Sequence, residues 1–298
     1  MEQLKQLLTA ADIAYKENEP LSAHCTFKIG VPARLFVQPV DRAQLCRAVA
    51  LCKAQGVRYY LLGNGSNILF ADEGYNGAVL SISSMQDAVE VHGTQLTAGA
   101  GVRLSTLCKT ALEHGLTGLE FAYGIPGTVG GAVYMNAGAY GGEMKDVLTT
   151  VQYLTAEGEI KEATVAELDL RYRHSIFEEN GGCILSAQFA LAPGEPEAIR
   201  TKMDELMAKR LDKQPLDKPS AGSTFKRPAG AFAAALIDQC GLRGYRHGGA
   251  AVSEKHCGFV VNLGGATCAD VLALCEEVRA IVKEKTGYDL EKEIRVVR

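Results

Sequence analysis

A dense run of glycine between residues 124 and 142 restricts the fold of this chain more than any other feature, with seven glycines within 19 positions. Glycine weakens packing and raises the entropy cost of folding, so a compact domain accepts such density mainly where backbone must approach a ligand closely. A second glycine loop, at residues 63–67, directly follows an apolar stretch at 58–62. Each loop alone is equally compatible with tight structural turns. Together, each following a predicted strand, they favour a dinucleotide ligand with a diphosphate and a large planar group.

Neither loop matches the standard nucleotide-binding motifs. The dinucleotide fingerprint would require a third glycine at position 68, which is Ile68, and no Gly-Lys-Ser/Thr P-loop sequence occurs in the chain. Consecutive backbone N–H groups can still converge on an anion where side chains are small. The sequence therefore predicts a diphosphate cradle of neither the Rossmann nor the P-loop type.

The composition is that of an ordinary globular protein and excludes several classes of function. The chain has 298 residues, of which 47% are hydrophobic and 22% charged, and this length predicts two or three domains. The net charge of -4 is scattered without a basic stripe, so nucleic acid is not expected as a partner. No apolar stretch is long enough for a membrane helix, and the N-terminus reads as an amphipathic helix. We expect a cytoplasmic protein with no membrane contact and no obligate protein partner.

Cysteine and histidine spacing gives no sign of a metal site. The nine cysteines are an odd number and contain no Cys-x-x-Cys pair, so neither a disulfide framework nor a zinc knuckle is indicated. We expect all nine to be reduced and structural. The six histidines show no His-x-x-x-His or His-Glu-x-x-His spacing.

Apolar periodicity predicts an α+β fold. The first part reads as a helix near residues 4–11, a strand over 34–40, a helix ending at Gly56 and a buried strand over 58–62, which would form a β-α-β unit. Short β-branched runs and glycine turns then fill residues 78–191, and they indicate a mixed or antiparallel sheet around one helix at 104–114.

Proline and glycine cluster at residues 192–197 and predict a domain boundary. We expect a domain over 1–194, made of subdomains 1–70 and 71–194, and a smaller α+β domain over 195–298. The second domain should hold four principal elements after an amphipathic helix that begins near Ile199, namely helices at 231–239 and 267–285 and strands at 259–263 and 293–297.

Three polar residues are candidates for catalysis, and each also has an ordinary structural explanation. Arg173 lies in a polar island and could bind a carboxylate bidentately, although composition alone favours a surface salt bridge. Ser223 lies in a loop of small residues that would expose its hydroxyl, although it lacks the Gly-x-Ser-x-Gly elbow and could simply form a turn. Glu293 is expected to open the last strand, on the same face as Glu291 and Arg295, where a solvated strand edge is the alternative.

The order of seven motifs resembles the UDP-N-acetylenolpyruvoylglucosamine reductase family, and the resemblance covers nearly the whole chain. An ordered set is far more specific than any one motif. The motifs are His24-Cys25-Thr26-Phe27-Lys28-Ile29-Gly30, Gly63-Asn64-Gly65-Ser66-Asn67, Gly124-Ile125-Pro126-Gly127-Thr128-Val129-Gly130-Gly131, Asn136-Ala137-Gly138-Ala139-Tyr140-Gly141, Tyr172-Arg173-His174-Ser175, Ala221-Gly222-Ser223-Thr224-Phe225-Lys226 and Glu293-Ile294-Arg295.

The resemblance implies a two-part FAD-binding domain of the vanillyl-alcohol-oxidase type followed by a substrate-binding domain. It implies Ser223 as proton donor, with Arg173 and Glu293 as its catalytic companions. It also implies that Lys213, Arg173 and Arg227 contact the substrate. The residues that it places around FAD are Gly63, Asn64, Gly65, Ser66, Asn67, Pro126, Gly127, Thr128, Gly130, Gly131, Asn136 and Gly138.

The implied reaction is the reduction of the enolpyruvyl ether of UDP-N-acetylglucosamine to UDP-N-acetylmuramate, a precursor of peptidoglycan. NADPH is the implied hydride donor, FAD the carrier, and the enolpyruvyl nucleotide sugar the second substrate. Arg227 stands where some family members carry asparagine, which leaves its substrate contact in question. The short segment between Arg173 and Lys213 resembles the subclass that lacks an insertion carrying a lid tyrosine.

Two other functions remain open on the sequence. A flavin oxidase with the same cofactor fold would be reoxidised by O2 and would turn over without NADPH. A non-catalytic module that binds flavin or a nucleotide sugar would be unaffected by replacing Ser223 or Glu293.

Overall fold

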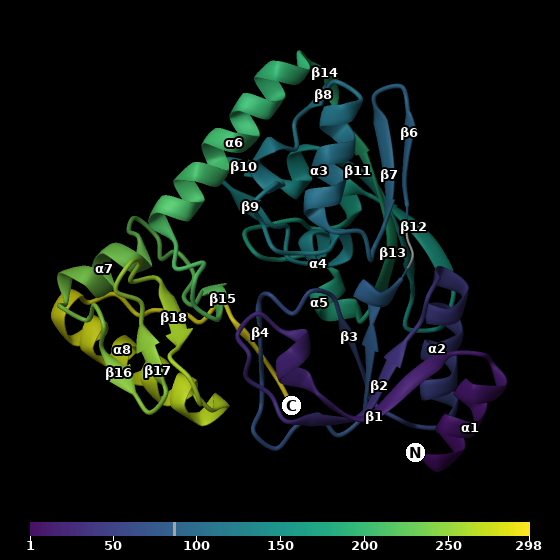
Figure 1. Ribbon diagram of the computed structural model, residues 1–298, viewed down its shortest axis with the longest axis horizontal. Coiled ribbons are helices and arrows are strands. Elements are labelled where there is room, and N and C mark those ends of the chain that lie inside the picture. Colours follow the sequence, from purple (N-terminus) through teal and green to yellow (C-terminus); the bar gives the residue numbers. More distant parts are fainter. Residues whose placement is uncertain (86–87) are drawn as a thin grey trace. The chain divides into compact units, whose positions relative to one another are not determined.

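The computed structural model describes residues 1–85 and 88–298 of the chain (Figure 1). These residues form two compact units, and neither unit is continuous in sequence. Unit 1 comprises Met1–Lys16, Leu35–Asn64 and Gly77–Arg210; unit 2 comprises Glu17–Arg34, Gly65–Asn76 and Leu211–Arg298. Two segments from the N-terminal third of the chain thus fold with its C-terminal part. The division into domains at 194/195 stays a prediction about ligand-binding parts, distinct from these compact units.

The first sheet has the strand order β1-β2-β5-β3, and β2 and β3 both run parallel to β5. Strand β5 therefore lies between the two strands of the expected β-α-β unit. The residue ranges are β1 (Ala14–Pro20), β2 (Pro32–Gln38), β3 (Tyr59–Leu62) and β5 (Ala78–Ser81), with helices α1 (Glu2–Ala10) and α2 (Arg42–Ala54).

Local sequence signals explain where α2 starts and stops. The Asp41 carboxylate accepts a hydrogen bond from the Gln44 backbone N–H at 2.8 Å, which caps the first turn. The helix buries Leu45, Val49 and Cys52, and Gly56 follows it with φ +60°. The sequence predicted the C-terminal end of this helix at Gly56.

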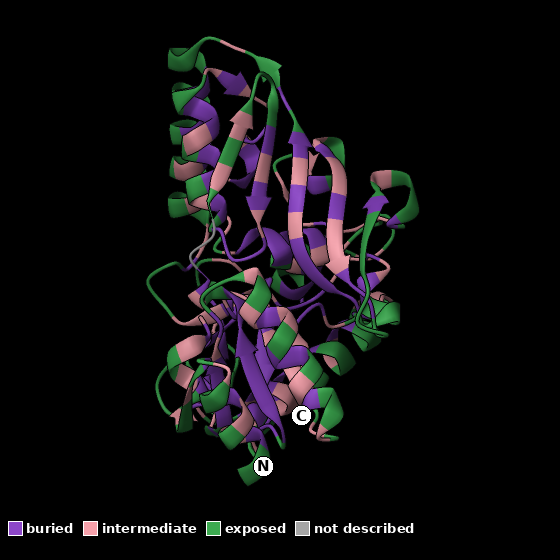
Figure 2. Ribbon diagram, turned by 90° about the vertical axis from the view of Figure 1, so that its right-hand side faces the viewer, coloured by how far each residue is buried: buried purple, intermediate pink, exposed green. Residues whose placement is uncertain are grey.

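The second sheet is antiparallel, with the order β12-β11-β13-β7-β6. Its long strands carry both buried and less buried residues, visible as bands in the upper part of Figure 2. Helix α4 packs on β13 and β7, and α3 packs on α4. The ranges are β6 (Val89–His92), β7 (Gln95–Gly99), β11 (Leu148–Leu154), β12 (Ile160–Thr164), β13 (Cys183–Ala190), α3 (Leu104–Glu113) and α4 (Val129–Tyr134).

Short elements complete unit 1 and carry part of the candidate site. Strands β9 and β10 form a small hairpin, and β8 pairs antiparallel with β14. Helix α6 follows, with Ile199, Met203 and Leu206 buried along one face. The ranges are β8 (Leu116–Thr117), β9 (Gly138–Ala139), β10 (Gly142–Glu143), α5 (Phe177–Asn180), β14 (Ala192–Pro193) and α6 (Pro196–Lys213).

Unit 2 contains a four-stranded sheet of order β15-β18-β17-β16 and a separate parallel pair, β4 with β19. Helix α8 begins with a capping box between Thr267 and Asp270 and ends at Gly287, which has φ +79°. The ranges are β4 (Ile68–Phe70), β15 (Ser220–Ser223), α7 (Ala233–Gln239), β16 (Arg246–His247), β17 (Ala250–Val252), β18 (Phe259–Asn262), α8 (Cys268–Thr286) and β19 (Arg295–Val297).

The last strand corrects one expectation about Glu293. Strand β19 starts at Arg295, so Glu293 precedes the strand and the predicted alternation of faces does not apply to it. Glu293 is buried, with 9% of its surface exposed, which also rules out a solvated strand edge. Burial of a carboxylate is costly unless the group is paired or hydrogen-bonded, so this position is more typical of a functional residue than of a surface one.

All nine cysteines are unpaired; Cys46 is partly exposed and the others are buried. Burial raises the pKa of the Cys52 thiol to about 11 and that of Cys275 to about 12.

Among the described residues, none of the helices has an apolar stretch that could span a membrane. The same residues contain no group of three or more His, Cys, Asp or Glu side chains that could hold a metal ion.

Candidate active site

The two glycine loops lie against each other in unit 1. The Asn64 side-chain amide donates a hydrogen bond to the Pro126 carbonyl oxygen at 2.8 Å. A Cβ added at Gly63 would stand 2.8 Å from Thr128 Oγ1, so only glycine fits there. Thr128 in turn caps α4 by accepting from the Gly131 N–H at 3.3 Å. Two loops about sixty residues apart in sequence thus form one surface, as a shared diphosphate site would require.

The second half of the shorter loop belongs to unit 2. Gly65 has φ +62°, and an added Cβ would overlap the His24 carbonyl oxygen. Its own carbonyl oxygen accepts from the Thr26 N–H at 3.1 Å, and the Thr26 hydroxyl donates to the Ser220 carbonyl oxygen at 2.6 Å. Asn67 accepts from the Arg295 N–H at 3.0 Å through its carbonyl oxygen. The loop is therefore fixed beside β15 and β19.

The free backbone donors of these loops indicate where an anion fits. Among the residues that the structure describes, no protein acceptor is bonded to the N–H of Asn64, Gly65 or Ser66. The N–H groups of Gly127 and Gly130 are instead bonded to the carbonyl oxygens of Ile125 and Ala100, both at 2.9 Å. The 64–66 segment therefore fits the diphosphate of FAD, whereas Gly127 and Gly130 can offer a ligand only their Cα and carbonyl surfaces.

Ser223 and Glu293 come together in unit 2 through their backbones. Ser223 ends β15 opposite Phe259, and the next residue, Thr224, accepts the Glu293 N–H at 2.8 Å. The Thr224 hydroxyl is buried and accepts the Val260 N–H at 2.9 Å, which fixes this segment to β18. The Asn67 amide reaches the Glu293 carbonyl oxygen at 3.4 Å. The structure thus brings the backbones of the Ser223–Thr224 segment, Glu293 and Asn67 together in unit 2.

Arg173 belongs to unit 1 and occupies a tight turn. The backbone groups of Arg171 and His174 bond to each other at 3.2 and 3.1 Å, and Arg173 has φ +57°, an uncommon conformation for a residue with a side chain. Its guanidinium lies 4.9 Å from the Tyr172 ring centroid and donates to the Gly138 carbonyl oxygen at 3.3 Å. Arg173 is therefore held by several contacts rather than left as a mobile surface cation.

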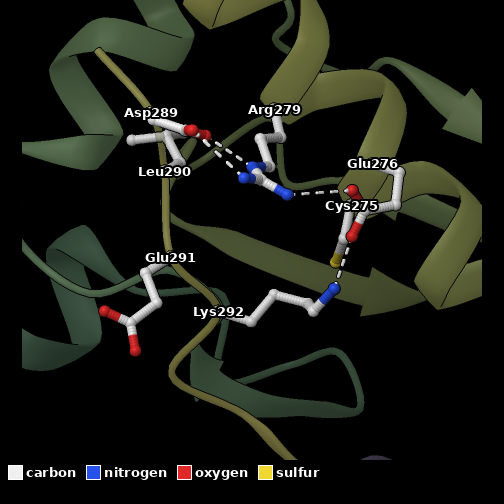
Figure 3. Close-up of a pocket in the computed structure, with 7 residues that line it drawn as sticks. All are labelled: Cys275, Glu276, Arg279, Asp289, Leu290, Glu291 and Lys292. Atoms are coloured by element: carbon white, nitrogen blue, oxygen red, sulfur yellow. Dashed lines mark hydrogen bonds and ion pairs between the residues drawn. The ribbon is translucent and has the colours of Figure 1, made fainter.

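A pocket of about 380 Å³ at the side of α8 is a separate feature (Figure 3). Its charged groups neutralise one another, with Arg279 bonded to Asp289 and Lys292 bonded to Glu276. Glu291 is paired with Lys226 at 2.6 Å. Because its charges are already paired, this pocket does not provide a strong site for a charged ligand.

Family models match the chain in two places. Residues 33–164 match a model described as "FAD binding domain". Residues 214–297 match the C-terminal domain of UDP-N-acetylenolpyruvoylglucosamine reductase. The first match includes both glycine loops, and the second includes Ser223 and Glu293.

Curated relatives match over the full length. The UDP-N-acetylenolpyruvoylglucosamine reductase of Agathobacter rectalis is 49% identical over 293 residues, covering 94% of this chain and 93% of that protein. The enzyme of Caldanaerobacter subterraneus subsp. tengcongensis is 46% identical and covers 100% of this chain and 97% of its own. This chain belongs to the UDP-N-acetylenolpyruvoylglucosamine reductase family.

A solved structure of the reductase family agrees with the fold. The crystal structure of UDP-N-acetylenolpyruvylglucosamine reductase from Thermus caldophilus superposes with a TM-score of 0.79 at 34% identity, covering 96% of this chain and 99% of that one. The predicted α+β fold, with an FAD-binding domain followed by the reductase C-terminal domain, is thereby confirmed.

Lys213 and Arg227, the other two residues predicted to contact substrate, are both exposed in unit 2. Lys213 is the last residue of α6. The Arg227 guanidinium lies 4.6 Å from the centroid of the exposed Phe232 ring. Their substrate contacts stay predictions of the family resemblance.

Sequence reasoning missed Arg210, in the last turn of α6. Its Nε is buried without a hydrogen-bond partner, and its Cδ would lie 3.0 Å from a Cβ added at Gly124. Burial lowers the pKa of its guanidinium, while nearby Tyr140 raises it. The signal was present in the spacing, because residue 210 continues the buried positions 199, 203 and 206 at helical intervals. An unsatisfied buried donor beside the second glycine loop fits a site that binds an acidic group.

Proposed function

We propose that this chain reduces the enolpyruvyl ether of UDP-N-acetylglucosamine with NADPH and yields UDP-N-acetylmuramate for peptidoglycan synthesis. The observation that carries the proposal is full-length membership of the reductase family, at 46–49% identity to curated enzymes. The backbone hydrogen bond between Thr224 and Glu293 supports it, because it holds the segment of Ser223 beside that of the buried Glu293. The residue roles below are part of the proposal.

FAD would be held by the loops Gly63 to Asn67 and Pro126 to Gly131, together with Asn136 and Gly138. When bound, it would supply hydride transfer from NADPH to the methylene carbon of the substrate. Arg173 binds the substrate carboxylate, on which negative charge grows as the double bond is reduced. Glu293 is the third catalytic residue of this proposal. Ser223 donates a proton to the adjoining carbon, since a carboxylate-stabilised carbanion is basic enough to take a hydroxyl proton.

Lys213 and Arg227 complete the proposal as contacts to the acidic groups of the nucleotide sugar. Both are cations on the exposed surface of unit 2, which suits recognition of a diphosphate. We place the chain in the shorter subclass without a lid-tyrosine insertion, because the segment from Arg173 to Lys213 holds only α5, β13, β14 and α6 as regular α and β elements. We also propose a cytoplasmic location, where NADPH and nucleotide sugars are available.

The test is a product assay. Purified protein is incubated with NADPH and the UDP-enolpyruvyl amino sugar, and the nucleotide sugar is analysed by mass spectrometry. The proposal predicts a product heavier by two hydrogen atoms, formed in a one-to-one ratio with NADPH consumed. NADPH consumption without a change in the sugar would contradict it.

A further inference from the structure

Two buried polar side chains, Asn136 and Ser175, support the turn that carries Arg173, and both are 0% exposed. The Asn136 amide donates to the Arg171 carbonyl oxygen at 3.1 Å and to the Glu143 carboxylate at 2.9 Å. Its own oxygen accepts the Lys145 N–H at 3.0 Å. Both N–H groups and the oxygen of this side chain therefore have protein partners.

Ser175 fixes the other end of the same turn. Its hydroxyl donates to the carbonyl oxygen of Tyr134, the last residue of α4, at 2.7 Å. Asn136 bonds to the residue two positions before Arg173, and Ser175 is two positions after it. The turn is therefore attached on one side to the end of α4 and on the other to the segment that follows it.

The conformation of Arg173 explains why such attachment is needed. Its φ of +57° lies in a region that residues with side chains seldom occupy, and it persists only where the surroundings enforce it. The backbone conformation of Arg173 sets the direction of its Cα–Cβ bond, and so the direction in which its guanidinium extends. Loss of either buried anchor would let the turn relax and the guanidinium move.

We propose that Asn136 and Ser175 are positioning residues, which hold the Arg171–His174 turn and so direct the Arg173 guanidinium toward the substrate carboxylate. The inference rests on the proposed function, in which Arg173 binds that carboxylate. Glu143 takes part as the second acceptor of Asn136, and its bond to Lys145 at 2.8 Å lowers the pKa of its carboxyl, as does the Asn136 amide.

The test variant is Asn136→Asp, which keeps the size and the acceptor for the Lys145 N–H but sets a carboxylate against Glu143 and the Arg171 carbonyl oxygen. Flavin is reduced photochemically without NADPH, and its reoxidation by the UDP-enolpyruvyl amino sugar is followed by stopped-flow absorbance. We expect reoxidation to slow about 10- to 100-fold, since a displacement of about 1 Å can cost a hundredfold. Each rate is measured on FAD-loaded protein, with the bound FAD quantified from the visible spectrum, because Asn136 also belongs to the proposed FAD site.

Asn180→Asp is the matched control. Asn180 accepts the Gly182 N–H at 2.8 Å outside this network, and the aspartate can accept the same bond. This variant should reoxidise at the wild-type rate. Ser175→Ala is the second test variant, which removes the other anchor without adding charge and should slow reoxidation in the same direction.

A double-mutant cycle separates positioning from a general structural role. In an Arg173→Ala background, Asn136→Asp should have no further effect on reoxidation, because the group through which it acts is gone. An equal slowing in both backgrounds, or wild-type reoxidation by both Asn136→Asp and Ser175→Ala, would overturn the inference. Failure of the wild type itself to reoxidise with substrate would instead refute the proposed function.

Discussion

Arg173 occupies a backbone conformation that glycine adopts more easily, with φ +57°. For most positions, alanine gives a more stable protein than glycine, but a left-handed residue costs about 1–2 kcal/mol unless it is glycine. We expect Arg173→Gly to be more stable than Arg173→Ala by about 1 kcal/mol in urea unfolding, while both lose activity. Equal stability of the two variants, or a more stable alanine variant, would show that the turn is not strained.

In the proposed mechanism, proton donation depends on Ser223. We expect Ser223→Ala to lower turnover by about 10² to 10⁴, the usual contribution of a positioned proton donor. The FAD absorbance of the purified variant should equal that of the wild type, because Ser223 is not among the residues proposed to hold FAD. Steady-state NADPH oxidation with substrate and the flavin spectrum measure the two quantities, and a loss of less than threefold would assign Ser223 to a turn.

At this scale the sequence left alternatives that only three-dimensional proximity resolves. The sequence pattern at Glu293 was compatible with a solvated strand edge, but Glu293 is buried and precedes the first residue of β19. Arg210 was missed for a different reason. Its helical spacing places it on the buried face of α6, but a charged residue is normally expected on the surface. The motif order, rather than any single residue, made Arg173, Ser223 and Glu293 candidates.

The glycine loops can be tested by comparing two glycines with the same backbone conformation. Gly65 and Gly93 both have φ +62°, but a Cβ at Gly65 would overlap the His24 carbonyl oxygen, whereas a Cβ at Gly93 meets nothing within 4 Å. Gly93→Ala should cost about 1 kcal/mol of unfolding free energy for its backbone conformation. Gly65→Ala should cost a further 1–3 kcal/mol through the overlap, and should release FAD. Chemical unfolding and flavin retention on gel filtration measure both, and similar results for the two variants would contradict the role of the loop.

The end of α8 should respond to acid. The Arg279 guanidinium beside Asp289, assisted by Lys283, holds the pKa of the Asp289 carboxyl well below its usual range. A folded-state pKa below the unfolded value means that the stabilisation is present at neutral pH and is lost as pH falls below about 4. We expect the wild type to lose more Tm than Asp289→Asn between pH 7 and pH 3 at low salt, where exposed ion pairs are least screened. Parallel Tm curves for the two proteins would show that this cluster contributes nothing.

Elements with strong local signals were predicted well, and those defined by distant pairing were not. Helices α2, α3 and α8 end before Gly56, Gly115 and Gly287, as expected. Strand β1 was missed because only two of its seven residues are even partly buried, so it carries no apolar alternation. The insertion of β5 between β2 and β3 could not be predicted, because strand order depends on contacts far apart in sequence.

On the scale of the whole molecule, the composition of unit 2 makes a prediction about fragments. Strand β19 pairs with β4, and the buried Asn262 amide bonds to the Phe27 carbonyl oxygen at 3.2 Å, so unit 2 needs residues from the N-terminal third. We expect an isolated 195–298 fragment to lack a cooperative thermal transition and to give poorly dispersed amide NMR signals. A cooperatively unfolding fragment would show that the linear division at residue 194/195 suffices for folding.

The discontinuous units also explain the limit of sequence reasoning at this scale. A reading along the chain detects a boundary where proline and glycine cluster, as at residues 192–197. It has no signal for the return of residues 17–34 and 65–76 to the C-terminal part, since that association rests on individual hydrogen bonds and one strand pair.

The central claim is that this chain is an FAD-dependent reductase that transfers reducing equivalents from NADPH to an enolpyruvyl nucleotide sugar. An anaerobic absorbance trace tests it most directly: one equivalent of NADPH is added to the FAD-bound protein, followed by the UDP-enolpyruvyl amino sugar. The account predicts that the flavin absorbance bleaches with NADPH and returns when the sugar is added, with no O2 present. A flavin that stays bleached until O2 is admitted, or a protein that holds no flavin, would contradict it.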